Sequence, residues 1–303
     1  MERGAVIDRP EELLPPAAIA RLEPDEADAL LDRLEARVPT HPALLPIPSG
    51  AVPALVFGDT HGDLPSVEAV LEEWANGPEE QLLIGLGDYV DRTPPDVPNG
   101  SVLNALYLLQ WAARCPERVV LLTGNHELAR RIPVVPSDLP AEIDDLWGPG
   151  IERQLRIAHL LERGPLAAYT ESGVFLAHAG FPRRRPRGDW TRAFDPPSEE
   201  AVAEVVWADC GASESRRRVV RAFTEPDLDR FLTDSGLVGL LRGHDPDLTG
   251  RRVFRDRCLT LHTTRYYAEY GGVLAARVPL AGRLASLADV ALVPLTPAAP
   301  TTE

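Results

Sequence analysis

The sequence predicts an α/β fold with a largely parallel sheet, because short buried strands alternate with helices along most of the chain. Six short runs rich in Val, Leu and Ile indicate strands, and several are continuous rather than alternating, as in strands buried on both faces; they lie at 51–57, 81–86, 118–122, 173–177, 237–241 and 257–261. Helical patterns separate the earlier runs, at about 65–75, 101–114 and 151–163. Polar residues beside glycine then follow five of the six runs.

The first 50 residues differ in composition from the rest of the 303-residue chain. They contain eight prolines and an acidic excess, and they hold one helix, expected from about Asp25 to Val38. Apolar residues fall on one face of this helix, which indicates that it docks on a larger body: Leu30, Leu31, Leu34 and Val38. We therefore expect three parts: an acidic, proline-rich N-terminal extension over 1–50, a core domain over 51–285 and a C-terminal tail over 286–303.

The segments after the strands carry the functional signal. In chain order they are Gly58-Asp59-Thr60-His61-Gly62, Gly87-Asp88-Tyr89-Val90-Asp91-Arg92, Gly124-Asn125-His126-Glu127, His178-Ala179-Gly180 and Arg242-Gly243-His244. In open α/β sheets, ligands bind beyond the carboxyl ends of the strands. Each segment alone could be a helix N-cap or a left-handed turn. Helix caps do not select histidine, however, and four of the seven histidines lie in these segments. Together the five segments predict a binding site.

The side chains in these segments are those that hold divalent metal ions without thiolate: carboxylate, amide oxygen and imidazole. Asp88 lies in the second segment and is the candidate to bridge two ions. Two ions about 3.5–4 Å apart can share a hydroxide, lower its pKa, and clamp the attacking and leaving oxygens of a phosphoryl group. The sequence therefore indicates a two-metal site suited to phosphate ester hydrolysis.

The five segments, in this order, resemble the signatures of the calcineurin-like metallophosphoesterases, in their phosphoprotein phosphatase branch: GDxHG, GDxVDRG, GNHE, HGG and R(A/G)H. The residues that precede two of these segments, 115–122 and 164–169, also resemble that branch. The resemblance covers about residues 51 to 280. It implies a sandwich of two β-sheets flanked by helices, with a dimetal site at the carboxyl ends of the strands.

The resemblance also implies a set of metal ligands. The first ion is expected on Asp59, His61 and Asp88, and the second on Asp88, Asn125, His178 and His244. His262 follows the last predicted strand, but the family has no histidine there, so we do not assign it to the site. Manganese is the expected metal, with iron, zinc or magnesium as alternatives, because oxygen and nitrogen ligands suit all four.

Further roles follow from the same resemblance. His126, paired with Asp91, resembles the family's general acid for the leaving oxygen, and Arg92 resembles a phosphate-binding arginine. A second such arginine is expected at Arg217, although the assignment is open among Arg216, Arg217 and Arg218 because the glycine that usually follows is missing. Tyr267 matches a tyrosine that lines the family's active site.

Net charge narrows the range of partners. The chain carries 31 basic residues, all arginine, against 46 acidic ones, a net charge of −15. This charge disfavours binding to nucleic acid polymers and anionic membranes, although a local arginine cluster or a metal can still attract a small anion. No apolar run reaches the length of a membrane span, and the N-terminus has no signal-peptide pattern. Three scattered cysteines form no disulfide framework, so we expect a cytoplasmic protein of unknown oligomeric state.

These observations predict a dimetal phosphomonoesterase that hydrolyses its substrate by direct attack of a metal-bridging hydroxide. A phosphoserine/phosphothreonine protein phosphatase is the first choice, because Asp91 in GDYVDR is what that branch carries. A dinucleoside polyphosphate hydrolase is an alternative; those enzymes resemble GDxVNRG. A nucleotide or nucleic-acid end phosphatase is another, and the last is a non-catalytic scaffold, which would be expected to have lost ligands. The motifs also depart from the family at Thr93 and Ala179, both glycine there.

Overall fold

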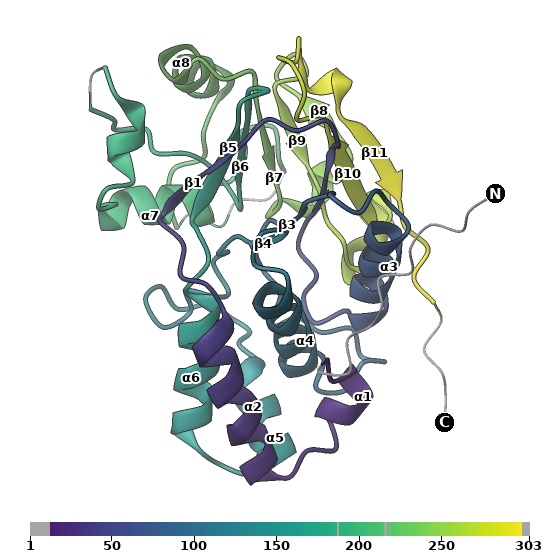
Figure 1. The fold of residues 1–303 in the computed structure, drawn as a ribbon. Coiled ribbons are helices and arrows are strands. Elements are labelled where there is room, and N and C mark those ends of the chain that lie inside the picture. Colours follow the sequence, from purple (N-terminus) through teal and green to yellow (C-terminus); the bar gives the residue numbers. More distant parts are fainter. Residues whose placement is uncertain (1–12, 187, 215–216, 218, 299–303) are drawn as a thin grey trace, which may run out of the picture.

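The computed structural model describes residues 13–186, 188–214, 217 and 219–298. Two mixed β-sheets pack face to face and helices cover their outer faces (Figure 1). The five-stranded sheet has the order β11 (Ala291–Pro294), β10 (Leu274–Val278), β2 (Ala54–Phe57), β3 (Leu83–Gly85), β4 (Val119–Leu121). The six-stranded sheet has the order β1 (Leu44–Ile47), β5 (Ala167–Thr170), β6 (Val174–Ala177), β7 (Gly239–Arg242), β9 (Cys258–Thr260), β8 (Arg252–Val253).

The helices fall into two groups. Those packed with the five-stranded sheet, or with helices that cover it, are α1 (Pro16–Ile19), α2 (Pro24–Arg37), α3 (Leu64–Ala75), α4 (Gly100–Arg114), α5 (Leu139–Trp147) and α6 (Ile151–Leu161). Those packed on the six-stranded sheet are α7 (Glu199–Trp207) and α8 (Glu225–Ser235). A short helix, α9 (Ala268–Gly271), and four 3-10 turns complete the described elements, among them η2 (Pro246–Leu248) and η3 (Arg265–Tyr267).

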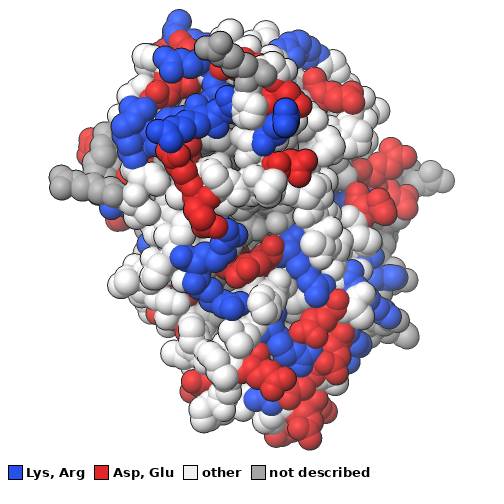
Figure 2. Space-filling view, turned by 90° about the vertical axis from the view of Figure 1, so that its left-hand side faces the viewer, with Lys and Arg blue, Asp and Glu red and all other residues white. Residues whose placement is uncertain are grey.

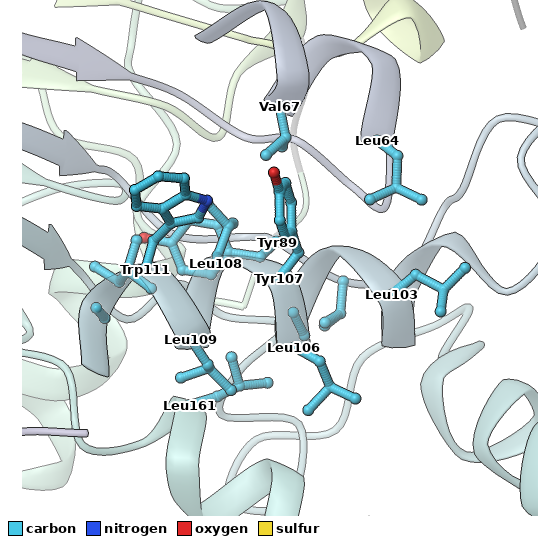
Figure 3. Close-up of a cluster of buried hydrophobic side chains, with 14 of the residues drawn as sticks. Leu64, Val67, Tyr89, Leu103, Leu106, Tyr107, Leu108, Leu109, Trp111 and Leu161 are labelled. Atoms are coloured by element: carbon cyan, nitrogen blue, oxygen red, sulfur yellow. The ribbon is translucent and has the colours of Figure 1, made fainter. Parts of the chain in front are cut away.

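Three apolar layers follow from the alternation of side chains along the strands. In β2, Leu55 and Phe57 point to the helices, where α4 supplies Leu106 and other buried side chains (Figure 3). Ala54 and Val56 point the other way and pack between the two sheets. Both faces of each sheet are therefore covered, which explains why the strands read as continuous apolar runs.

The expected sandwich of two sheets flanked by helices is confirmed, and the sheets are mixed rather than largely parallel. Strands β2, β3 and β4 run parallel, as do β6, β7 and β9, whereas β10 runs antiparallel to β2 and β5 antiparallel to β6. The five polar segments follow five of these parallel strands: β2, β3, β4, β6 and β7. Their carboxyl ends therefore meet at one place.

The sheets extend beyond the boundaries expected at residues 50 and 285. Strand β1 pairs with β5 from inside the N-terminal extension, and β11 pairs with β10 from inside the C-terminal tail. Pro46 lies in β1, which is an edge strand, where a missing N–H breaks no hydrogen bond between strands. Proline content here is therefore compatible with an edge strand. Among the described residues, no helix is long and apolar enough to span a membrane.

The helix expected over 25–38 is present as α2 and docks as its apolar face predicted. Leu30, Leu31 and Leu34 are buried in the same layer as α4. Ion pairs hold its polar face to α6: Arg153 Nη2 lies 2.7 Å from Asp28 Oδ2, and Arg156 Nε lies 2.7 Å from Glu35 Oε1. Figure 2 views the molecule from the left-hand side of Figure 1. Acidic and basic side chains lie side by side over its lower part, where α2 and α6 lie in Figure 1.

Candidate dimetal site

The six side chains expected as metal ligands lie together in loops that follow β2, β3, β4, β6 and β7. All six are buried, between 0% and 4% exposed, although none is apolar. Buried polar groups need partners, so this concentration of carboxylate, amide and imidazole requires an explanation. The six residues are Asp59, His61, Asp88, Asn125, His178 and His244.

Four of these side chains point donor atoms at one place. His178 Nε2 lies 2.9 Å from Asn125 Oδ1, 3.1 Å from His244 Nδ1 and 3.4 Å from Asp88 Oδ2. Asn125 Oδ1 and His244 Nδ1 are 3.1 Å apart. These separations are close to those of ligands that share one small cation. The set matches the second ion expected from the sequence.

The remaining side chains form a second group that shares Asp88. His61 Nε2 lies 3.9 Å from Asp59 Oδ2 and 3.8 Å from Asp88 Oδ2. The same Asp88 oxygen therefore faces both groups, as a carboxylate that bridges two ions would. Two imidazoles have fixed orientations, because His61 Nδ1 donates to Val90 O at 3.0 Å and His178 Nδ1 donates to Leu86 O at 3.1 Å. Such bonds turn the Nε2 lone pair inward, the usual arrangement for a metal-binding histidine.

Backbone strain marks the same loops. His61, Asp88 and His244 have left-handed φ values of 46°, 56° and 73°, which non-glycine residues adopt rarely and mostly at functional sites. Glycine is required where the backbone approaches a ligand: a Cβ at residue 243 would overlap Asp59 Oδ1, and one at residue 124 would overlap Asp88 Oδ1. The strained backbone at these residues lowers local stability, and it allows these side chains to converge.

Electrostatics inside the site favour a cation. Burial alone would raise the pKa of Asp59, but the His262 and His178 imidazoles hold that pKa at about 2. Burial lowers the pKa of His178, yet Asp88 and Asp59 outweigh it and raise that pKa to about 9. Burial lowers the pKa of His61 to about 4, which leaves it neutral and able to coordinate. Asp59 and Asp88 thus favour positive charge at the point where the donor atoms converge.

One buried carboxylate, that of Glu127, binds backbone N–H groups of the loops instead of facing the ligand cluster. Glu127 accepts hydrogen bonds from the backbone N–H groups of Asp88 at 2.7 Å, Tyr89 at 2.8 Å and Gly124 at 2.8 Å. Burial and the charge of Asp88 raise its pKa to about 7. The GNHE segment therefore clamps the loop that presents Asp88. No role was expected for Glu127 from the sequence, although it lies in the segment Gly124-Asn125-His126-Glu127.

Comparison with known proteins agrees with this geometry. Residues 52–248 match the model of the calcineurin-like phosphoesterase family. The chain belongs to this family. This match and the two-sheet fold confirm the family and the fold that the motifs predicted.

Two relatives and one solved structure that match this chain are named as serine/threonine phosphatases. A PP2A-like serine/threonine-protein phosphatase of Candida albicans is 27% identical over 86% of this chain and 60% of its own length. A protein of Encephalitozoon cuniculi, named a probable serine/threonine-protein phosphatase, is 30% identical over 66% of this chain and 44% of its own length. This chain thus spans 44% of the length of the second relative and 60% of the length of the first. The solved structure of a Saccharomyces cerevisiae serine/threonine phosphatase superposes with a TM-score of 0.71 at 21% identity, covering 95% of this chain and 91% of that one.

The two residues expected as an acid–base pair, His126 and Asp91, lie in contact. His126 Nδ1 lies 2.7 Å from Asp91 Oδ2, and no hydrogen-bond partner meets His126 Nε2 among the described residues. Asp91 is itself held in place, because its Oδ1 accepts from Asp138 N at 2.6 Å and Leu139 N at 3.0 Å, at the start of α5. Burial would lower the pKa of His126, but Asp88 and the bond to Asp91 raise it. The imidazole can therefore hold a proton on Nε2, facing the ligand cluster.

The two residues expected to contact phosphate on this side also lie together. Arg92 Nη1 donates to Tyr267 Oη at 3.1 Å. The Tyr267 ring packs edge-on against His61 at 5.8 Å between ring centres. Arg92 and Tyr267 therefore border the ion expected on Asp59 and His61.

Arg217 lies beside the site but is already paired. Its Nη1 lies 2.5 Å from Asp209 Oδ1 and 2.9 Å from Asp245 Oδ1, and its Nη2 donates to His244 O at 2.6 Å. Asp209 Oδ1 also lies 3.5 Å from His244 Nε2, so it links the arginine to a metal ligand. Asp209 is not among the site residues expected from the sequence. Arg216 and Arg218 lie outside the described residues.

Proposed function

We propose that this chain is a phosphomonoesterase that binds two divalent ions and hydrolyses phosphoserine or phosphothreonine in proteins. The observation that carries the proposal is the convergence of six buried donor side chains, with Asp88 Oδ2 between two groups of imidazoles. Oxygen and nitrogen donors in this number suit manganese, and we propose Mn²⁺ as the first metal to test, with iron and zinc next.

The bound ions would supply two functions: activation of a water molecule as the nucleophile, and neutralisation of charge on the phosphate. The side chains around them supply the rest. Arg92 presents a guanidinium that suits two phosphate oxygens at once, and Tyr267 Oη accepts from it and limits its freedom. His126 carries a proton that its Nε2 can give to the leaving oxygen, while Asp91 stabilises the charged imidazole.

The His126–Asp91 pair favours an alcohol as the leaving group. A serine or threonine alkoxide is a poor leaving group and needs a proton as the bond to phosphorus breaks. A phosphate leaving from a polyphosphate is far more stable as an anion and needs much less help. A buried carboxylate that raises the pKa of the acid is therefore of most use with an alkyl phosphate. The relatives named as serine/threonine phosphatases act on substrates of this kind, which supports the same choice here.

A substrate panel tests the proposal. Purified protein is loaded with Mn²⁺, and phosphate release is measured from a phosphoserine peptide, a phosphothreonine peptide, a dinucleoside tetraphosphate and 5′-phosphorylated DNA. The proposal predicts the highest kcat/KM for a phosphopeptide and no activity in Asp88→Asn. Higher kcat/KM for the dinucleotide or the DNA would replace the substrate class, and release that Asp88→Asn leaves unchanged would reject the site.

A further inference from the structure

The backbone holds His262 beside Asp59. Residues 59 and 262 form an isolated parallel β-bridge, and Thr263 N donates to Asp59 O at 2.9 Å. Asp59 follows β2 of one sheet and His262 follows β9 of the other, so this bridge joins the two sheets at the site. The His262 imidazole is 0% exposed, and its Nε2 lies 3.3 Å from Asp59 Oδ2. The Tyr267 ring packs edge-on against it at 5.5 Å between ring centres.

The hydrogen bonds of Thr249 determine which nitrogen of His262 carries the proton. Thr249 Oγ1 donates its single proton to Pro246 O at 2.7 Å. The 3.1 Å contact between His262 Nδ1 and Thr249 Oγ1 therefore runs from Nδ1–H to the oxygen. In the neutral ring, Nε2 is then an acceptor, and no hydrogen-bond partner meets it among the described residues. It faces an Asp59 oxygen that is also an acceptor, and a metal ion bound between the two atoms would satisfy both, as would a proton on Nε2.

Two expected ligands, His61 and His178, have the same arrangement of bonds. Each donates Nδ1–H to an oxygen acceptor and turns Nε2 toward the carboxylates of the site. Two ligands about 2.1 Å from one ion lie roughly 3.0–3.4 Å apart when they subtend angles between the octahedral and tetrahedral values. The 3.3 Å between His262 Nε2 and Asp59 Oδ2 falls in this interval.

We propose that His262 is a further ligand of the ion expected on Asp59, His61 and Asp88. The inference rests on the proposed function, because it concerns the same metal site. The first ion would then receive two imidazoles and two carboxylates from the chain instead of one imidazole and two carboxylates. A second imidazole adds a strong neutral donor and favours Mn²⁺, Fe²⁺ or Zn²⁺ over Mg²⁺, which prefers oxygen.

Metal binding by variants tests the inference without any substrate. Mn²⁺ binding to the metal-stripped wild type, His262→Phe and His262→Gln is measured by equilibrium dialysis and titration calorimetry. His159→Phe, at an exposed histidine on α6, is the matched control. We expect two Mn²⁺ per chain in the wild type and in the control. In the His262 variants we expect one ion to keep its affinity and the other to bind at least about tenfold more weakly.

Nitrogen NMR of the wild type, labelled with ¹⁵N-histidine, separates a ligand from a residue that only orients Asp59. On addition of Zn²⁺, the Nε2 resonance of His262 is expected to move together with those of His61 and His178. Unchanged affinities in both His262 variants, or a His262 Nε2 that still carries a proton when both ions are bound, would overturn the inference. A wild type that binds no metal would instead reject the proposed function, so the two failures are distinguishable.

Discussion

The substitution Asp91→Asn tests the role of His126 as an acid more sharply than removal of the histidine. The asparagine oxygen can still accept from Asp138 N and Leu139 N, so the start of α5 is retained. Its amide nitrogen, however, replaces the carboxylate oxygen that lies 2.7 Å from His126 Nδ1. The variant therefore removes one charge-assisted hydrogen bond to the imidazolium and leaves the ligand cluster in place.

The magnitude follows from that bond. A hydrogen bond to a charged partner contributes about 1.5–3 kcal/mol. If the full bond stabilises the protonated imidazole, its loss lowers kcat by about 10- to 150-fold, at 1.36 kcal/mol for each factor of ten. The loss applies only where the leaving group needs a proton. We therefore expect that range for phenyl phosphate and a phosphoserine peptide, and only a severalfold loss for 4-nitrophenyl phosphate, whose anion leaves readily.

The assay is a comparison of kcat across aryl phosphates of graded leaving-group pKa, for the wild type, Asp91→Asn, His126→Gln and the double variant. Metal content and thermal midpoint serve as controls and should stay at wild-type values in Asp91→Asn. Because the two residues act as a unit, the double variant should be no slower than His126→Gln. Equal losses for every leaving group, or fully additive losses in the double variant, would refute the proposed acid.

Three further predictions concern stability. Leu34→Ala, in the buried face of α2, should lower the free energy of unfolding in urea by about 2–5 kcal/mol; Arg33→Ala on the exposed face is the control and should change it by less than about 0.5 kcal/mol, and equal effects would show that α2 does not dock. The hydrogen bond from Arg156 lowers the pKa of Glu35, so this pair stabilises the fold above the ordinary glutamate pKa and the effect is lost as the pH falls through the lowered value. Arg156→Gln should therefore lower the thermal midpoint most near pH 7 and progressively less as the pH falls below the ordinary glutamate pKa; the same loss at every pH would contradict this. Removal of metal by a chelator should also lower the midpoint, because ions that bind only the folded state stabilise it, and added Mn²⁺ should restore it.

Several parts of the fold could be predicted because their signal is local. The helices α3, α4 and α6 show apolar periodicity, and the strands of the parallel cores are continuous apolar runs. Strand β10 was missed because Leu274–Val278 includes two alanines and an arginine, which have low strand preference, and it is stabilised by pairing with β2 and β11. Helix α5 is not among the helices expected from the sequence, because prolines favour loops; Pro140 nevertheless stands in its first turn, where proline is tolerated.

The motifs in the sequence predicted six of the side chains that lie in the candidate site. His262 and Asp209 were not predicted, because only the folded chain brings them next to those side chains. His262 lies more than 200 positions from Asp59 in the chain, and only the bridge between the ends of β2 and β9 brings them together. Asp209 gains its role because Arg217 and His244 both approach it. The spacing of the residues shows neither contact, because Asp59 and His262 follow strands of different sheets, whereas Asp209 follows α7 and His244 follows β7.

The central claim is that the buried donors hold metal ions on which phosphate ester hydrolysis depends. The most direct test is phosphate release from a phosphoserine peptide by one preparation, measured after removal of metal and again after titration with Mn²⁺, with bound metal counted in the same samples. We expect no release from the metal-free protein and activity that rises as the second ion binds. Hydrolysis that persists in the metal-free protein would contradict it.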